Sequence, residues 1–210
     1  MNTIFEQLAK MRLVPVIVIK DAANAVPLAK ALCEGGLPCA EVTMRTPQAA
    51  DAIRAISSTV SDILLGAGTV LTIQQVDIAI TAGAKFIVSP GLNPEVVRYC
   101  QSKNVPVLPG VCTPTEVEQA LGLGLKALKF FPAEAAGGAN MIKALSGPYG
   151  DVTFMPTGGI TQKNLHDYLS VKSVFACGGS WMVNDELIST GNFAKITELT
   201  RDAVALANSK

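Results

Sequence analysis

Short apolar runs that alternate with helical patterns are the feature that most constrains the fold of this chain. The spacer segments carry apolar residues at three- and four-residue steps, the pattern of an amphipathic helix. The runs follow one another at about 20 to 30 residues, roughly the length of one βα unit. The strand candidates are VPVIVI (14–19), CAEVTM (39–44), ILLGAG (63–68), FIVS (86–89), VPVLPG (105–110), ALKFF (127–131), VTFMPTGG (152–159) and VFACGGS (174–180).

Eight βα units in one chain predict an α/β fold, a single (β/α)8 TIM barrel. An open, doubly wound sheet is the alternative that the same pattern allows. Residues 2–12 precede the first strand and read as an extra N-terminal helix, which could close the bottom of the barrel. No linker or low-complexity tract divides the sequence, so we expect one domain over residues 1–210.

Composition excludes several classes of partner. Basic and acidic side chains balance, 17 of each, and form no basic stripe, so nucleic acid is not expected. No apolar run reaches the ~18 residues of a membrane span, and the N-terminus has no signal-peptide core. The five cysteines form no CxxC pair and fit free thiols in a reducing cytoplasm. A single histidine, His166, argues against a histidine triad or a histidine-rich metal site, although carboxylates could still bind a metal.

The ends of the strands are where a barrel of this class gathers its functional residues. The second strand ends EVTMR, where Glu41, Thr43 and Arg45 would share one face because strand side chains alternate. An acid and a guanidinium there could carry a proton and anchor a carboxylate, or they could form a structural ion pair. The third strand ends in GAGT, where Thr69 offers a hydroxyl to a ligand or only a helix cap.

Lys129 lies within the sixth apolar run, on the face opposite to Leu128 and Phe130. Holding a charge there costs several kcal/mol unless the charge is paired or lost. Burial favours the neutral amine, which is a nucleophile. An ion-paired or snorkelling lysine is the alternative. Lys126 lies on the other face, near the start of the strand, and is expected to reach solvent.

Two glycine-rich ends follow the last two strands, TGG (Thr157, Gly158, Gly159) and GGS (Gly178, Gly179, Ser180). Glycines leave backbone N–H groups bare, and the start of a following helix would add its positive dipole end. Loops after strands seven and eight form the usual phosphate site of this barrel class. The pattern therefore predicts a phosphate site, with tight turns alone as the alternative.

Together these motifs resemble the bacterial 2-keto-3-deoxy-6-phosphogluconate (KDPG) / 4-hydroxy-2-oxoglutarate (KHG) aldolase family. The resemblance implies a class I aldolase without metal or cofactor that cleaves KDPG to pyruvate and glyceraldehyde 3-phosphate, commonly as a homotrimer. Cys112, where a small residue such as Ser is expected, and Ala136, where Asn is frequent, depart from the family pattern. The matching stretches occur in the family's order and cover nearly the whole chain: VPVIVIK, EVTMRT, GAGTV, SPGL, LKFFPAE, PTGGI and GGSW.

The resemblance also implies a role for each site residue. Lys129 would form the Schiff base, and Glu41 would act as the general acid and base. Arg45 and Thr69 would bind the carboxylate of the keto acid. The remaining implied residues are Phe131 and Pro132 beside the lysine, Thr157 in the substrate pocket, and Gly158, Gly159, Gly179 and Ser180 at the phosphate.

Three other functions compete with this interpretation. The first is cleavage of unphosphorylated KHG to pyruvate and glyoxylate, which a dual enzyme would also perform. The second is a phosphate-sugar isomerase or epimerase on the same barrel, which needs an acid/base pair but no imine lysine. The third is a catalytically silent binding or assembly protein, whose signature would be the loss of Lys129, Glu41 or Arg45. All three residues are present.

Overall fold

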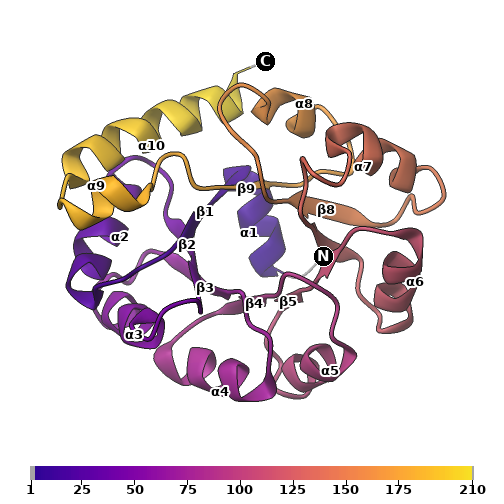
Figure 1. Ribbon diagram of the computed structural model, residues 1–210, viewed down its shortest axis with the longest axis horizontal. Coiled ribbons are helices and arrows are strands. Elements are labelled where there is room, and N and C mark those ends of the chain that lie inside the picture. The colour runs from indigo at the N-terminus through magenta and orange to yellow at the C-terminus, as the bar shows by residue number, and fades with distance from the viewer. Residues whose placement is uncertain (1–2, 210) are drawn as a thin grey trace.

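The computed structural model describes residues 3–209, in which strands and helices alternate along the chain (Figure 1). The strands are β1 (Leu13–Ile17), β2 (Cys39–Thr43), β3 (Leu64–Gly68), β4 (Phe86–Val88), β5 (Val107–Leu108), β6 (Gly110–Val111), β7 (Ala127–Phe130), β8 (Thr153–Pro156) and β9 (Cys177–Gly179). The helices are α1 (Thr3–Met11), α2 (Ala25–Glu34), α3 (Ala49–Thr59), α4 (Ile73–Ala82), α5 (Pro94–Ser102), α6 (Pro114–Gly122), α7 (Gly138–Ser146), α8 (Leu165–Leu169), α9 (Asp185–Ser189) and α10 (Phe193–Asn208), with a short 3-10 helix, η1 (Ala22–Asn24).

The strands form two parallel sheets rather than one closed ring. One sheet has the order β5-β4-β3-β2-β1-β9 and the other the order β6-β7-β8. The expected closed (β/α)8 TIM barrel is therefore wrong, whereas the α/β class and the parallel pairing are confirmed. Figure 1 shows helices α2 to α10 around the outside of the strands.

The strand ladder is interrupted at two places, between β5 and β6 and between β8 and β9. Pro109 lies between β5 and β6, and because proline has no N–H to donate, the fifth apolar run is split into two short strands. At the other junction, single bridges pair Phe154 with Val174 and Thr157 with Gly178 in place of a continuous ladder. The sequence pattern located each strand but contained no information on whether neighbouring ladders would join.

The N-terminal helix α1 lies at the N-terminal ends of the strands, where we expected it. Its predicted range began at residue 2, which lies outside the described residues. Phe5 is buried, and its ring centroid lies 6.4 Å from that of Phe175. Phe5 also lines a cavity of about 670 Å³ together with Val107, Ala127 and Thr153, each the first residue of its strand. Helix α1 therefore covers the end of the molecule opposite to the strand ends that carry the predicted site.

Several helices begin at residues whose side chains cap them. Thr72 accepts a hydrogen bond from the backbone N–H of Gln75 at the start of α4. Thr113 and Glu116 form a reciprocal capping box at the start of α6. Because such caps satisfy backbone N–H groups that have no partner within the helix, they fix where the loop after each strand ends.

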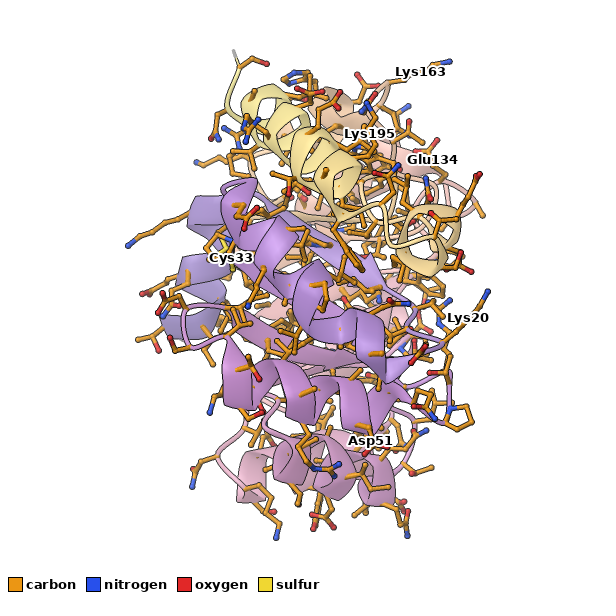
Figure 2. The ribbon with its side chains drawn as sticks, turned by 90° about the vertical axis from the view of Figure 1, so that its left-hand side faces the viewer. Lys20, Cys33, Asp51, Glu134, Lys163 and Lys195 are labelled. Carbon is orange, nitrogen blue, oxygen red and sulfur yellow. The ribbon has the colours of Figure 1, made fainter. Side chains whose placement is uncertain are left out.

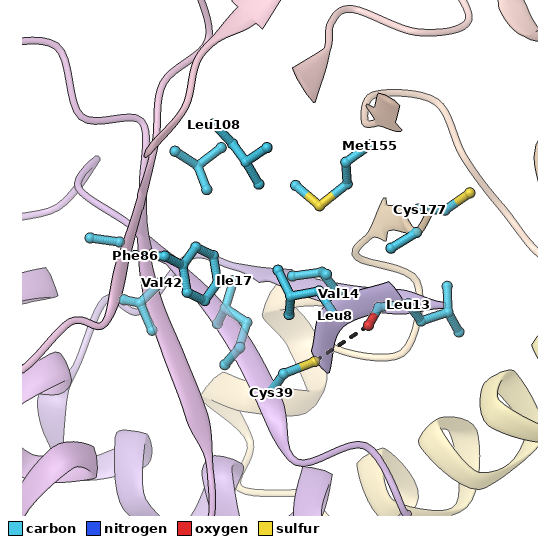
Figure 3. Packing of buried hydrophobic residues seen from close by; sticks show 14 of the residues in the cluster. Leu8, Leu13, Val14, Ile17, Cys39, Val42, Phe86, Leu108, Met155 and Cys177 are labelled. Carbon is cyan, nitrogen blue, oxygen red and sulfur yellow. Dashed lines mark hydrogen bonds between the residues drawn. The ribbon is translucent and has the colours of Figure 1, made fainter. Parts of the chain in front are cut away.

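Buried side chains from both sheets share one interior. Leu108 of β5 and Met155 of β8 are fully buried members of the same hydrophobic cluster, and Figure 3 shows them facing a common space. In the same region the thiol of Cys39 donates to the carbonyl oxygen of Leu13 at 3.3 Å. The two sheets are thus held together by packing where backbone pairing is interrupted.

Candidate active site

A buried ion pair joins the two sheets. Glu41 comes from β2 of the six-stranded sheet and Lys129 from β7 of the three-stranded sheet. Lys129 Nζ lies 3.4 Å from Glu41 Oε1, with side-chain exposures of 5% and 0%. Each charge is costly at such a site without the other, so the pair accounts for a lysine in an apolar strand. Lys126 is exposed, as expected from its place near the start of the run, and it pairs with Asp151 at 3.1 Å just before the first residue of β7.

The surroundings of the pair hold both side chains in place. The Phe131 ring lies beneath the ammonium, with its centroid 5.3 Å from Lys129 Nζ. Gly68 packs against the carboxylate, because a Cβ at that position would lie 2.2 Å from Glu41 Oε1. Glu41 Oε2 is buried and has no hydrogen-bond partner within the described residues. One oxygen of Glu41 therefore holds the lysine, while the other can accept a proton or a hydrogen bond from a bound molecule.

Arg45 and Thr69 form a second contact at the same strand ends. Arg45 Nε donates to Thr69 Oγ1 at 3.1 Å. Thr69 directly follows Gly68 and has a φ of 55°, a left-handed conformation that is strained for a β-branched residue. Such strain clusters at functional sites, where the surrounding structure enforces it. The contact places a guanidinium beside the loop that packs on the Glu41 carboxylate.

The expected row of Glu41, Thr43 and Arg45 along one strand is wrong at its last member. Strand β2 ends at Thr43, whose hydroxyl donates to the carbonyl oxygen of Ile17 at 2.9 Å. The chain turns there, and the backbone N–H of Arg45 donates to the carbonyl of Thr43 at 2.8 Å. Strand alternation therefore does not govern Arg45, which reaches Thr69 from a turn.

The loop after β8 lies beside the segment that follows Lys129. The backbone N–H of Thr157 donates to the carbonyl of Phe130 at 2.9 Å. A Cβ on Gly158 would lie 3.4 Å from the Phe131 ring. Gly158 and Gly159 have φ values of 102° and 78°, a region open to glycine at little cost. These glycines therefore lie near the lysine, separated from it by Phe131.

The side chain of Thr157 is buried against the last strand. Its Oγ1 has no hydrogen-bond partner in the described part of the chain. A Cβ on Gly178 would lie 2.3 Å from that oxygen, so only glycine leaves room for it. A buried hydroxyl without a partner is costly, and a bound polar molecule could satisfy it.

The outer members of the predicted site differ in exposure, since Gly179 is buried whereas Ser180 and Pro132 are exposed. Gly179 ends β9 and packs on the indole of Trp181, where an added Cβ would lie 2.1 Å from the ring. Ser180 is exposed, as is Pro132, which follows Phe131 through a cis peptide bond. The structure thus brings Lys129 into contact with Glu41 and Phe131 and sets the remaining predicted residues at the strand ends and in the loops around them.

Sequence reasoning missed the structural roles of three residues. Gly68 was read only as part of a glycine-rich strand end, although its place before Thr69 could have suggested close packing. Glu134 closes the LKFFPAE stretch and was given no role. Glu134 accepts a hydrogen bond from the hydroxyl of Tyr168, which lies 34 residues further along the chain, so no local spacing links the two residues.

The cysteine thiols are poor candidates for a nucleophile. All five cysteines are free. Burial raises the pKa of Cys100 to about 11, and burial also raises the pKa of Cys39 and of Cys177. These three thiols stay protonated near neutral pH, and the thiolate is the nucleophilic form.

Residues 3–209 contain neither a candidate metal cluster nor a helix that could span a membrane. No group of three or more His, Cys, Asp or Glu side chains in this range could hold a metal ion. None of the helices in the same range is long and apolar enough to cross a membrane.

Comparison with known proteins points to one family. A family model described as KDPG and KHG aldolase matches residues 4–199. The 2-dehydro-3-deoxy-phosphogluconate aldolase of Treponema pallidum (strain Nichols) is 50% identical over 206 residues, covering 98% of each chain. The KHG/KDPG aldolase of Escherichia coli (strain K12) is 47% identical over 191 residues, covering 91% of this chain and 90% of the relative.

A solved structure agrees closely with this chain. It is a KDPG aldolase from Legionella pneumophila in which pyruvate was captured at low pH as a covalent carbinolamine intermediate. The two superpose with a TM-score of 0.92 at 44% identity, covering 95% of this chain and 97% of the other.

The buried pair generates a prediction about stability. Lys129→Met leaves Glu41 buried without a cation and should lower the free energy of unfolding by about 3 kcal/mol in urea titrations. The double variant Lys129→Met/Glu41→Gln, neutral at both positions, should recover part of that loss. Lys126→Met, which removes a surface pair, is the control and should cost less than about 1 kcal/mol. Equal stability of the single and double variants would show that the pair carries no buried charge.

Proposed function

This chain belongs to the KDPG and KHG aldolase family, and we propose that Lys129 and Glu41 carry out its reaction. The chain is an aldolase, a lyase that cleaves KDPG to pyruvate and glyceraldehyde 3-phosphate. The observation that carries the residue assignment is the buried contact of 3.4 Å between the amine and the carboxylate. A nucleophile with an acid/base group in reach is what imine chemistry needs.

The first step joins the substrate to the lysine. Glu41 accepts a proton from the Lys129 ammonium, and the neutral amine attacks the C2 ketone to form a carbinolamine. Glu41 then gives that proton to the carbinolamine hydroxyl, which leaves as water, and the product is a protonated imine. The imine is itself the electron sink for the next step, so the proposed reaction needs no metal and no cofactor.

The second step breaks the carbon–carbon bond. Glu41, directly or through one water, removes the proton of the C4 hydroxyl. The C3–C4 bond breaks, its electron pair flows to the imine nitrogen, and glyceraldehyde 3-phosphate leaves. Glu41 returns the proton to C3 of the enamine, and water then releases pyruvate and the free amine. Glu41 Oε2, buried without a partner among the described residues, is available for these transfers.

The remaining residues would hold the substrate. Arg45 donates to Thr69 through Nε, and its other guanidinium N–H groups remain as donors that suit a carboxylate. Phe131 and Pro132 would shape the pocket beside the lysine, and the Thr157 hydroxyl would bond the bound keto acid. At the other end, the proposed phosphate site consists of Gly158, Gly159, Gly179 and Ser180.

Cleavage of KHG is proposed as a second activity. The proposal is supported by the Escherichia coli relative, which is named a KHG/KDPG aldolase. Both substrates share the keto-acid end that Lys129 and Arg45 would hold, and they differ in the phosphate. Comparison of kcat/KM for the two substrates measures the preference. Family membership sets aside the phosphate-sugar isomerase alternative.

We also propose that one domain over residues 1–210 assembles as a homotrimer in the cytoplasm. One hydrophobic cluster through the described residues supports the single domain, and five free thiols support a reducing compartment. The trimer has the support of the family resemblance alone. Sedimentation equilibrium should give the mass of three 21.9 kDa chains, and the mass of one chain would reject the trimer. Thiol titration of freshly isolated, denatured protein checks the compartment.

Replacing the proposed nucleophile tests the assignment. Lys129→Arg should abolish cleavage while the fold persists, because a guanidinium stays protonated and cannot attack a ketone. Pyruvate release in a coupled assay measures the activity, and circular dichroism checks the fold. Lys126→Arg, in the same segment but exposed, is the matched control and should keep full activity. Normal turnover by Lys129→Arg would reject the assignment.

Replacing the proposed acid/base group tests a different part of the mechanism. Glu41→Gln keeps the shape of the side chain but cannot carry the proton, so kcat should fall by roughly 10²- to 10⁴-fold. The dissociation constant for pyruvate should change far less. Steady-state kinetics and a pyruvate titration measure the two quantities. A variant that loses affinity and keeps kcat would return Glu41 to a structural role.

A further inference from the structure

Glu134 connects the segment after Lys129 to the glycine loop after β8. The backbone N–H of Glu134 donates to the carbonyl of Gly158 at 3.0 Å. One residue earlier, the N–H of Ala133 donates to the carbonyl of Thr157 at 2.9 Å. The two loops therefore run side by side beyond the ends of their strands. In Figure 2, Glu134 lies toward the same side of the molecule as Lys20, which follows β1.

The Glu134 side chain is held between Gly159 and Tyr168. A Cβ on Gly159 would lie 2.6 Å from Glu134 Cγ and 2.7 Å from Glu134 Cβ, so the side chain lies directly on the glycine. The Tyr168 hydroxyl of α8 donates to Glu134 Oε1. Tyr168 is 1% exposed, and burial together with the Glu134 bond raises its pKa, so the hydroxyl keeps its proton.

A third contact fixes the far side of the loop. Asn164 Nδ2 donates to the carbonyl of Gly159 at 3.1 Å, and Asn164 Oδ1 accepts from the backbone N–H of Thr161 at 2.8 Å. Consecutive left-handed glycines have few conformational preferences of their own. The position of Gly158 and Gly159 must therefore come from neighbours. Phe131 packs on Gly158, and Glu134 and Asn164 contact Gly159. Tyr168 in turn holds Glu134.

We propose that Glu134 and Tyr168 are positioning residues that fix the spacing between Lys129 and the Gly158–Gly159 loop. The inference rests on the proposed function, in which Lys129 holds the keto-acid end of KDPG and this loop holds its phosphate. Lys129 and Glu134 lie in one short stretch, LKFFPAE, so the two ends of the substrate site are spaced through that stretch. The distance between Lys129 and the Gly158–Gly159 loop then selects a phosphorylated substrate of matching length.

The keto-acid end of the site does not depend on this contact. Glu41 and Phe131 contact the Lys129 amine, and Gly68 packs on Glu41. Phe131 also packs on Gly158, but none of these three residues makes a hydrogen bond that holds Glu134. Loss of the Tyr168–Glu134 bond should therefore weaken recognition of the phosphate and leave imine chemistry intact. A role in overall stability alone would affect both ends of the site alike.

The test compares two reactions of the same enzyme. Cleavage of KDPG needs both ends of the site, whereas exchange of the pyruvate methyl protons with deuterium needs only the imine lysine and its acid/base group. Tyr168→Phe removes the hydroxyl and keeps the ring. It should raise KM for KDPG about tenfold, the equivalent of about 1.4 kcal/mol, and change the exchange rate less than about twofold.

The chain contains a matched control and a conservative variant. Tyr149→Phe removes another tyrosine–glutamate bond, the 2.9 Å contact with Glu118 at the surface, and should change neither reaction. Glu134→Gln keeps an acceptor for Tyr168 and should stay within about threefold of the parent KM, whereas Glu134→Ala should reproduce the effect of Tyr168→Phe. Thermal unfolding verifies that each variant is folded, and the two Glu134 variants carry the test if Tyr168→Phe does not fold.

The outcomes separate this inference from the proposed function. No change in KM for Tyr168→Phe or Glu134→Ala, or an equal loss in both reactions, would overturn the positioning role. It would leave the aldolase mechanism untouched. Absence of pyruvate exchange in the parent enzyme would instead reject the imine mechanism, and the positioning role with it.

Discussion

Glu41 and Lys129 reach each other from two different sheets, and neither charge could remain in that interior alone. The contact requires that Glu41 of β2 and Lys129 of β7 face each other across the interior. It also requires a glycine at position 68, because a Cβ there would clash with the carboxylate. The Phe131 ring then closes the space beneath the amine. Because the two sheets pack around a shared core, Glu41 can lie beside Lys129 and offset the free-energy cost of burying a charged lysine.

The same contact explains how one carboxylate can serve opposite proton transfers. Burial removes the water that would otherwise compete for both groups, and it strengthens their interaction. Glu41 Oε1 faces the amine, and Glu41 Oε2, without a partner among the described residues, is free for the reacting atoms. Forming and breaking the imine both require a group that gives and takes a proton, and the geometry supplies one group for both.

Short-range patterns predicted much of this, and long-range pairing could not be predicted from them. The apolar run correctly marked Lys129 as buried, and the position of Lys126 near the start of that run correctly marked it as exposed. The alternation of faces did not decide this, because Leu128 and Phe130, on the other face of β7, are buried as well. The closed barrel was wrong because Pro109 interrupts the ladder and because single bridges replace a ladder before β9. Glu134 and Tyr168 meet across a loop and a helix, a contact that no local spacing encodes.

Trapping the imine tests the central claim most directly. The protein is incubated with pyruvate and borohydride, digested, and its peptides are mapped by mass spectrometry. The account predicts a reduced pyruvyl adduct on Lys129, and none on exposed lysines such as Lys126. A folded protein that forms no adduct, or that carries the adduct on another lysine, would contradict the account and make the buried Lys129–Glu41 pair a purely structural contact.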